Sequence, residues 1–266
     1  MSNNFESGFI QYPALNRYDT IRHFTTTRMG GVSTGNYSSF NLGLFSDDNP
    51  DDLSQNFKIL STLTNIPEDN IHLPFQTHSN KIFLIDEDFL SKDNETRQAM
   101  LQGVDALITN IPNQCIGVST ADCVPVLLYD PVHRAISSVH AGWRGTCSKI
   151  LSLVISTMKT TFNTNPKDLI AVIGPSISPE VYEVGISLLE KFGDAGFDTR
   201  KIFIHKDGKT YLDLWSANKI LLRNEGVPEE NIEISGICTF VNHENFFSAR
   251  RLGIHSGRMI SGIMLI

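Results

Sequence analysis

The sequence predicts a mixed α+β fold. Short runs rich in Val, Ile and Leu, typical of buried strands, are interspersed with segments whose apolar residues recur every three or four positions, as in amphipathic helices. The two kinds of segment do not alternate strictly, which favours an α+β architecture over a doubly wound parallel sheet. At 266 residues, with 41% hydrophobic and 19% charged residues, the chain is long enough for one large domain or two small ones.

Composition excludes several classes of protein. A formal net charge of -7 and the lack of a basic stripe argue against a nucleic-acid binder, which needs cations to displace counterions from phosphates. The longest apolar runs fall far short of the roughly 18 residues of a membrane span, and residues 1–13 lack the basic and apolar regions of a signal peptide. We therefore expect a cytoplasmic protein without a membrane partner. The cysteines have no CxxC spacing and are expected to be thiols: Cys115, Cys123, Cys147 and Cys238.

In the first half of the chain, a long segment rich in glycine, serine and asparagine follows the first expected strand. This segment, residues 28–50, contains Arg28 and Asn41, and a loop of this length serves either a site or a surface connection. Asp51 or Asp52 can cap the next helix, whose apolar residues form one stripe. The expected elements are a strand at Ile21–Thr26, a helix over residues 53–63, and strands over residues 81–85, 103–109 and 115–119.

The centre of the chain, residues 117–146, holds the strongest candidates for chemistry. Two short apolar runs, residues 124–130 and 134–140, are joined at Pro131 and predict neighbouring buried strands with a tight connection. Cys123 opens the first run and His140 closes the second. An antiparallel pair would therefore bring these two side chains, both good metal ligands, to one edge of the sheet.

An amphipathic helix is expected over residues 147–162, directly after the GWRGT sequence. The free backbone N–H groups and dipole at a helix N-terminus favour an anion, and the glycines of GWRGT permit close approach of a ligand. Arg144 would add a bidentate donor suited to phosphate or carboxylate. The sequence therefore predicts an anion site beside the cysteine and the histidine.

The second half has a similar mixture of elements. Asp213 can cap one of its helices, and Gly226 can end the same helix. Arg250, Arg251 and Arg258 form the strongest positive cluster, which is either a solvated face or an anion site. The expected elements are strands over residues 169–173, 232–239 and 259–266, helices over residues 186–192 and 214–224, and a hairpin over residues 201–209.

Other polar residues have two interpretations each. His78, in the QTHS sequence, is either a hydrogen-bonded structural residue or a ligand. Asp105, near the start of a strand, is either a general acid or base or a turn and capping group. Common nucleotide, zinc-protease and serine-hydrolase motifs are absent, as is the paired-cysteine signature of zinc deaminases. The eight histidines never occur as HxH, which argues against a centre with several coppers.

Several motifs, taken in order, resemble the YfiH or laccase-domain family, once called multicopper polyphenol oxidases. One such motif is weak evidence, whereas the ordered set is specific and covers nearly the whole chain. The motifs are RMGGVS, SFNLG, QTHS around His78, DALIT from Asp105, TADCVPVLLYD around Cys123, SVHAGWRG around His140, IGPSISPEVYEVG from Ile173 and FFSARR near the C-terminus.

The resemblance implies a single domain over residues 1–266 with a mixed-sheet αββα sandwich of the cytotoxic-necrotizing-factor and YfiH-like type. It implies a zinc ion held by His78, Cys123 and His140. It also implies phosphorolysis of adenosine, inosine and methylthioadenosine, together with deamination of adenosine. The expected partners are purine nucleosides and phosphate, and the expected assembly is a monomer or a small homo-oligomer.

The chemistry of these residues is compatible with that implication. Two histidines and a cysteine suit zinc, and three protein ligands leave a fourth position open for water or substrate, as in catalytic sites. Cys123, His140 and Arg144 are therefore the expected catalytic residues. We expect phosphate or nucleoside contacts from Arg28, Asn41 and Arg144, with Arg250 behind them.

Three alternatives stay open at this point. Cys123 and His140 would also serve a metal-free cysteine hydrolase as nucleophile and base. A copper-containing, laccase-like polyphenol oxidase is the second alternative, with Cu²⁺ in place of Zn²⁺. A zinc-stabilised interaction protein is the third, although a structural zinc site usually has four protein ligands.

Overall fold

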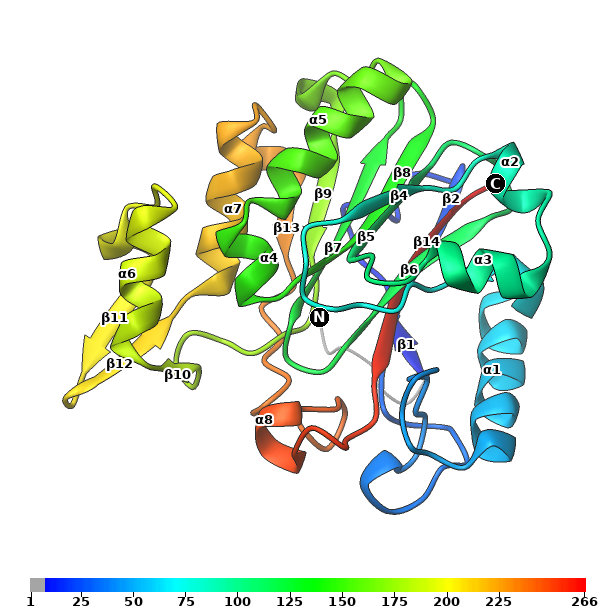
Figure 1. Cartoon of the computed structure of the whole chain (residues 1–266), viewed down its shortest axis with the longest axis horizontal. Helices are drawn as coiled ribbons and strands as arrows, with labels where there is room; N and C mark the ends of the chain where they lie inside the picture. The colour runs from blue at the N-terminus through cyan, green and yellow to red at the C-terminus, as the bar shows by residue number, and fades with distance from the viewer. Residues whose placement is uncertain (1–7) are drawn as a thin grey trace.

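The computed structural model describes residues 8–266, and its centre is a six-stranded mixed sheet (Figure 1). The expectation that no signal peptide is present depends partly on residues 1–7, which lie outside the described residues. The end pairs β13–β9 and β5–β4 are parallel, and the pairs between them are antiparallel. In order across the sheet the strands are β13 (Ile232–Ile234), β9 (Ile170–Ile173), β7 (Val124–Asp130), β8 (Ala135–Ala141), β5 (Ala106–Thr109) and β4 (Ile82–Leu84).

A five-stranded sheet lies against one face of the six-stranded sheet. Its strands pair antiparallel except for β3 and β6, which are parallel. In order they are β1 (Phe9–Ile10), β2 (Ile21–Thr26), β14 (Met259–Leu265), β6 (Cys115–Thr120) and β3 (Ile71–His72). The C-terminal strand β14 therefore lies in the middle of this sheet, beside strands from the first half of the chain.

Alternation of side chains along β7 shows how the layers pack. Val126 and Leu128 pack toward the helices α5 (Ile150–Phe162) and α7 (Leu214–Asn224). Leu127 and Tyr129 face the opposite way, into the core between the two sheets. Both faces of the strand are buried, which explains why its sequence is an unbroken apolar run.

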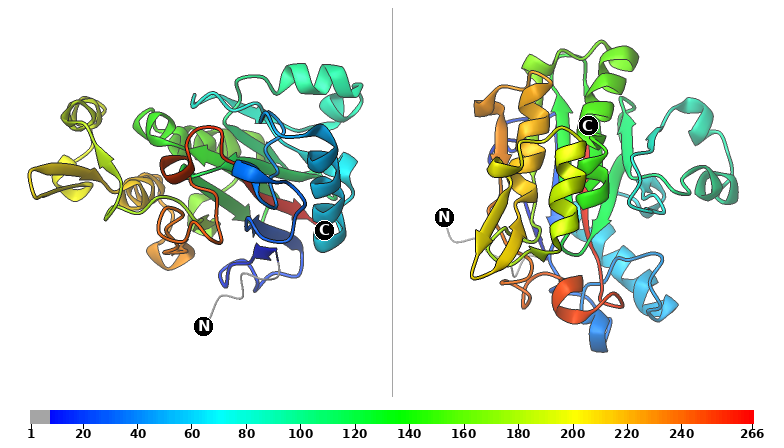
Figure 2. Two further views of the ribbon diagram at one scale, coloured as in Figure 1. Left: turned by 90° about the horizontal axis from the view of Figure 1, so that it is seen from below. Right: turned by 60° about the vertical axis from the view of Figure 1, so that its left-hand side comes forward.

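The outer face of the five-stranded sheet is covered by α1 (Pro50–Thr64). Leu60 of this helix packs with Phe24 and Ile260 of the sheet in a separate core. The layers therefore run helix, sheet, sheet, helix, as Figures 1 and 2 show from three directions. This arrangement confirms the predicted mixed-sheet αββα sandwich.

Smaller elements surround the sandwich. A three-stranded sheet extends from the side of α7 together with α6 (Figure 1). Its strands are β10 (Glu183–Val184), β12 (Lys209–Leu212) and β11 (Phe203–Lys206), and the other helices are α2 (Glu87–Leu90), α3 (Asn94–Met100), α4 (Trp143–Cys147), α6 (Ile186–Asp194) and α8 (Ala249–Leu252). Within residues 8–266, no helix has the length and apolar character needed to cross a membrane.

The predicted start of the helix after GWRGT is wrong. The structure has a five-residue helix, α4, over Trp143–Cys147, and the long helix α5 begins only at Ile150. Lys149 separates them with φ 59° and ψ 42°, a left-handed conformation that cannot continue a right-handed helix. The long helix therefore does not place its N-terminus at Cys147, where the anion site was expected.

Two other boundaries also differ from the predictions. Asn49, rather than Asp51 or Asp52, caps α1, because its side chain accepts a hydrogen bond from the Asp51 amide. The strand predicted over residues 232–239 ends at Ile234, and Gly236 in the following segment has φ +66°. That left-handed backbone conformation is incompatible with continuing the strand.

Candidate metal centre

The antiparallel pair β7–β8 places Cys123 beside His140. Pro125 lies opposite His140, and Val124 lies opposite Ala141, so Cys123 and His140 meet at the same end of the pair, as predicted. His78 approaches from an earlier segment that leads toward β4, and its Nε2 lies 3.8 Å from Cys123 Sγ. The ring centroids of the two histidines are 4.8 Å apart.

These three side chains form a compact set of possible metal ligands. Each residue offers one ligand atom, and the three atoms lie within 4.8 Å of one another. Among residues 8–266 this is the single group of three or more His, Cys, Asp or Glu side chains with such geometry. Two imidazoles and a thiol suit zinc, and a three-residue set leaves room for a further ligand. The donor set therefore fits a catalytic zinc site.

Asp105 holds both histidines in place. Its carboxylate accepts a hydrogen bond from Nδ1 of His140 at 2.7 Å, and so leaves Nε2 of that ring for a metal. It also accepts hydrogen bonds from the backbone amides of Thr77, His78 and Ser79 and from the Ser79 hydroxyl. One fully buried carboxylate thus fixes the segment that carries the first histidine and the ring of the second.

Strand pairing explains why Asp105 reaches this position. Ala106 of β5 pairs with Val139 of β8, so Asp105 and His140 are neighbours across the ladder, and the His140 amide donates to the Asp105 carbonyl at 2.8 Å. From the sequence, Asp105 was either an acid or base or a turn group. The structure gives it a third role, that of a carboxylate that orients a candidate ligand. Pairing the expected strand over residues 103–109 with the one over 134–140 could have predicted this contact.

Gly142 allows the cluster to form. A Cβ atom at this position would lie 2.9 Å from Cys123 Sγ and 3.2 Å from Cδ2 of His78. Neither neighbour is the free end of a long flexible side chain, so any larger residue would displace the candidate ligands. This close approach is the physical reason for the first glycine of the GWRG sequence.

The electrostatics of the cluster favour a thiolate. Burial raises the pKa of Cys123, but the charge and hydrogen bonding of His140 and the contact with His78 outweigh burial and lower it overall. For His140 burial lowers the pKa, whereas Cys123 and Asp105 stabilise the imidazolium and raise it overall. The thiolate is the form of cysteine that acts as a metal ligand or a nucleophile.

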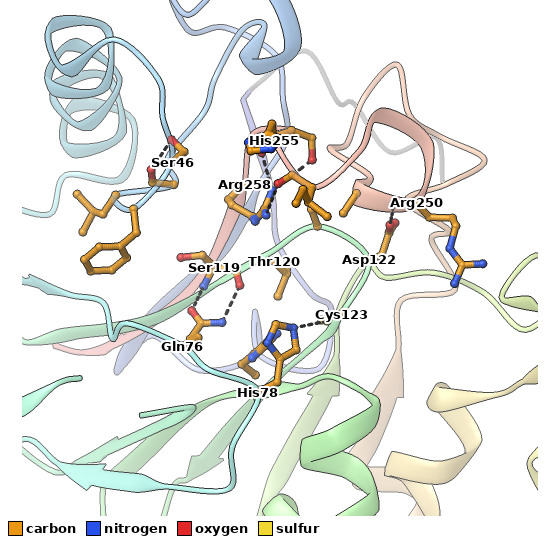
Figure 3. A pocket seen from close by; sticks show the side chains of 18 of the residues that line it. Ser46, Gln76, His78, Ser119, Thr120, Asp122, Cys123, Arg250, His255 and Arg258 are labelled. Carbon is orange, nitrogen blue, oxygen red and sulfur yellow. Dashed lines mark hydrogen bonds between the residues drawn. The ribbon is translucent and has the colours of Figure 1, made fainter. Parts of the chain in front are cut away.

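The cluster opens into a cavity of about 710 Å³ (Figure 3). Most of the lining comes from four segments, namely the 37–47 loop, residues 74–78, residues 119–123 and the C-terminal stretch 249–258, and His140, Ile177 and Tyr182 complete it. Phe45 and Phe75 lie in its wall with their ring centroids 4.7 Å apart, and they remain 52% and 36% exposed. Arg250 and Arg258 contribute positive charge to the same cavity.

Of the predicted catalytic and substrate-binding residues, Cys123, His140 and Arg250 line the cavity together with the candidate metal ligand His78. Arg250 lies over the ring of Tyr182 and donates to the Glu183 carbonyl.

The remaining three predicted residues do not line the cavity. The guanidinium of Arg28 donates to the carbonyls of Ser38 and His243, and it packs over the ring of Phe247. Arg144 is exposed and stacks on its neighbour Trp143.

Asn41 is fully buried and supports the cavity wall from behind. Its Oδ1 accepts hydrogen bonds from the amides of Gly43 and Arg258, and its Nδ2 donates to Ser46 and Asp48. Arg258, which sequence reasoning treated only as part of a charged cluster, is thereby fixed in the cavity wall.

Comparison with known proteins identifies the family. Residues 22–266 match the model of the family described as multi-copper polyphenol oxidoreductase laccase. The chain belongs to this family. A purine nucleoside phosphorylase from Bacteroides thetaiotaomicron is 47% identical over 259 residues, which cover 96% of each chain. Adenosine deaminase RL5, from an unknown prokaryotic organism, is 39% identical over 246 residues, covering 91% of this chain and 93% of the relative.

The same family is recovered from solved structures. The crystal structure of the Bacillus licheniformis hypothetical protein YfiH superposes with a TM-score of 0.90 at 30% identity. The superposition covers 98% of this chain and 97% of the Bacillus licheniformis chain. The predicted resemblance to the YfiH family is therefore confirmed over nearly the whole length.

Proposed function

We propose that the protein is a zinc-dependent purine nucleoside phosphorylase acting on adenosine, inosine and methylthioadenosine, with adenosine deaminase activity. The observation that carries the proposal is the His78, Cys123 and His140 cluster at the wall of a cavity. It is supported by relatives that are named for these two activities and that align along more than nine-tenths of this chain.

The cavity suits the purine base of a nucleoside and a phosphate group. The exposed rings of Phe45 and Phe75 offer an apolar face for a purine base, because bases stack on aromatic side chains. Arg250 and Arg258 supply positive charge for a phosphate group. The proposed contacts do not include Arg28, Asn41 or Arg144, because these residues do not line the cavity.

The protein's own residues would hold and orient the zinc ion. His140 would bind through Nε2 while Asp105 holds its Nδ1 proton, and Cys123 would bind as the thiolate that its surroundings favour. When bound, zinc supplies Lewis-acid chemistry that activates water for deamination. For phosphorolysis, the cationic side chains would hold phosphate against the ribose, where the negative charge of the phosphate would stabilise the positive charge developing on the sugar.

Incubation with adenosine, with and without phosphate, tests the proposal. We expect adenine and ribose 1-phosphate only when phosphate is present, and inosine under both conditions. Chromatographic identification of the products, together with metal analysis of the purified protein, provides the measurement. A protein that contains zinc but releases none of these products from adenosine, inosine or methylthioadenosine would contradict it.

One observation favours a second candidate, the metal-free cysteine hydrolase. Cys123, His140 and Asp105 form a chain of nucleophile, base and orienting carboxylate, which is the arrangement of a catalytic triad. Chelation separates the two candidates. The zinc enzyme loses activity when stripped and regains it with added zinc, whereas the hydrolase keeps its activity without metal and loses it to iodoacetamide.

A further inference from the structure

Thr120, the last residue of β6, carries a buried hydroxyl that the protein does not satisfy. The residue is 1% exposed, and its Oγ1 has no hydrogen-bond partner among the residues that the structure describes. Nearly all buried polar atoms in folded proteins are paired, because an unpaired one destabilises the fold. An unpaired hydroxyl that is retained in a core therefore needs a reason.

The position of Thr120 supplies that reason. The residue lines the cavity three positions before Cys123, and Figure 3 shows it between Ser119 and Asp122 with its side chain on the side of His78. Rotation about one side-chain bond reorients the hydroxyl of this cavity-lining residue without movement of the backbone.

The chain on both sides of Thr120 is fixed. The side chain of Gln76 donates to the Ser119 carbonyl at 2.8 Å and accepts from the Ser119 amide at 2.7 Å. The carboxylate of Asp122 accepts hydrogen bonds from the hydroxyls of Thr239 and Ser248 and from the Arg250 amide. These contacts fix the backbone on both sides of the threonine, and the carboxylate of Asp122, two residues further on, bonds to other groups.

A positively charged side chain lines the same cavity as Thr120. Thr120 pairs with Met259 of β14, and the preceding residue, Arg258, lines the same cavity. The carbonyls of Ile254, Ser256 and Gly257 accept hydrogen bonds from the guanidinium and hold it in position. A hydroxyl donor next to a fixed guanidinium suits an anionic oxygen.

We propose that Thr120 donates its hydroxyl hydrogen to an oxygen of inorganic phosphate held beside Arg258. The inference rests on the proposed phosphorylase function, in which phosphate is a substrate. Thr120 is then unpaired only in the free protein, and the hydrogen bond forms when phosphate binds. Removal of the hydroxyl should therefore leave the free protein as stable or more stable, and it should weaken the binding of phosphate.

The test compares Thr120→Val, which keeps the shape, with Thr120→Ser, which keeps the hydroxyl. Loss of a hydrogen bond to a charged ligand weakens binding by roughly 10- to 100-fold. We expect the valine variant to have an unchanged or higher Tm, a Kd for inorganic phosphate raised by that factor in calorimetry, and a raised KM for phosphate. The effect on the KM for phosphate should exceed any effect on the KM for nucleoside, and the serine variant should bind phosphate within about threefold of the wild type.

Thr164 provides a matched control. Its hydroxyl is also buried and without a partner in the described part of the chain, but the residue follows α5 and does not line the cavity. Thr164→Val should leave phosphate binding unchanged, and its Tm reports the effect of removing an unpaired hydroxyl alone.

Three outcomes would overturn the inference: wild-type-like phosphate binding by Thr120→Val, a raised KM for nucleoside alone, or a wild type that binds no phosphate. The proposed function fails separately, if the wild type yields no phosphate-dependent product although calorimetry detects phosphate binding that depends on Thr120.

Discussion

Two histidines of this protein, His23 and His140, are equally buried, each 3% exposed, and yet their surroundings favour opposite charge states. Nε2 of His23 accepts a hydrogen bond from the Tyr12 amide, and burial lowers its pKa to about 4. His140 donates Nδ1–H to Asp105 and lies beside Cys123, and its pKa is raised.

Burial therefore does not distinguish a structural histidine from a functional one, and the type of partner does. For His23, a backbone amide donates to Nε2 and no carboxylate among the described residues offsets burial, which keeps the ring neutral within the five-stranded sheet. A buried carboxylate orients His140 and leaves its second nitrogen for a ligand. The same contrast separates Asn41, whose polar atoms are used within the protein, from Cys123, whose sulfur lines the cavity.

Replacing Cys123 by alanine should have the largest effect, because it removes the thiolate from a set of three ligands. We expect loss of bound zinc and a decrease of at least about 1,000-fold in both activities, with the fold retained. Metal analysis and product assays provide the measurement, and circular dichroism controls for folding. If the alanine variant retained zinc and turnover, the cluster would not be the site of zinc binding and catalysis.

Asn41→Ala tests the opposite class of residue, one whose polar atoms all have partners within the protein. The change leaves the amides of Gly43 and Arg258 without their acceptor in a buried loop. We expect the free energy of unfolding to fall by about 2–4 kcal/mol, measured by urea denaturation. The KM for nucleoside should remain within a few-fold of the wild type at a temperature where the variant is folded. A raised KM with unchanged stability would instead favour the direct substrate contact expected from the sequence.

Asp105→Asn tests whether the carboxylate is what separates His140 from His23. The amide retains the size of the side chain but loses the charge that stabilises the imidazole N–H donor. Removal of such an orienting carboxylate typically lowers metal affinity by about 10- to 100-fold. Competition with a chromophoric chelator measures this affinity, and excess zinc should restore part of the activity. Unchanged zinc affinity would mean that Asp105 only holds the backbone of residues 77–79 and does not support metal binding.

Local patterns predicted much of the fold and part of the site. The apolar runs at residues 124–130 and 134–140 identified the hairpin, and the ends of these runs correctly brought Cys123 to His140. The start of α5 at Ile150, rather than at the predicted residue 147, has no local signal, because the left-handed conformation that precedes it belongs to Lys149 and not to a glycine.

The remainder of the site depends on contacts between distant segments. The proximity of His78, Cys123 and Asp105 is fixed by strand pairing and by hydrogen bonds between segments far apart in the chain. Arg28 and Asn41 had suitable chemistry, but only the structure shows that their polar atoms are already occupied. Residue type predicts what a side chain can do, whereas tertiary contacts decide whether it is free to do it.

The pH dependence of stability should reveal His23 with the smallest effect of the series. Its folded pKa of about 4 lies below the ordinary value of 6.5, so the unfolded chain takes up the proton first as the pH falls. The contribution of His23 to stability should therefore be constant above about pH 7 and should decrease between pH 6.5 and pH 4, with a loss of about 1.4 kcal/mol by pH 5.5.

His23→Gln isolates this contribution from that of the other histidines, because glutamine can accept the same hydrogen bond from the Tyr12 amide but does not titrate. Urea unfolding of both proteins at pH 7.5 and pH 5.5 gives the difference in slope. The variant should lose about 1.4 kcal/mol less than the wild type over this interval. Equal losses in the two proteins would mean that His23 is not held neutral, and burial together with a backbone donor would then not be enough to set it apart from His140.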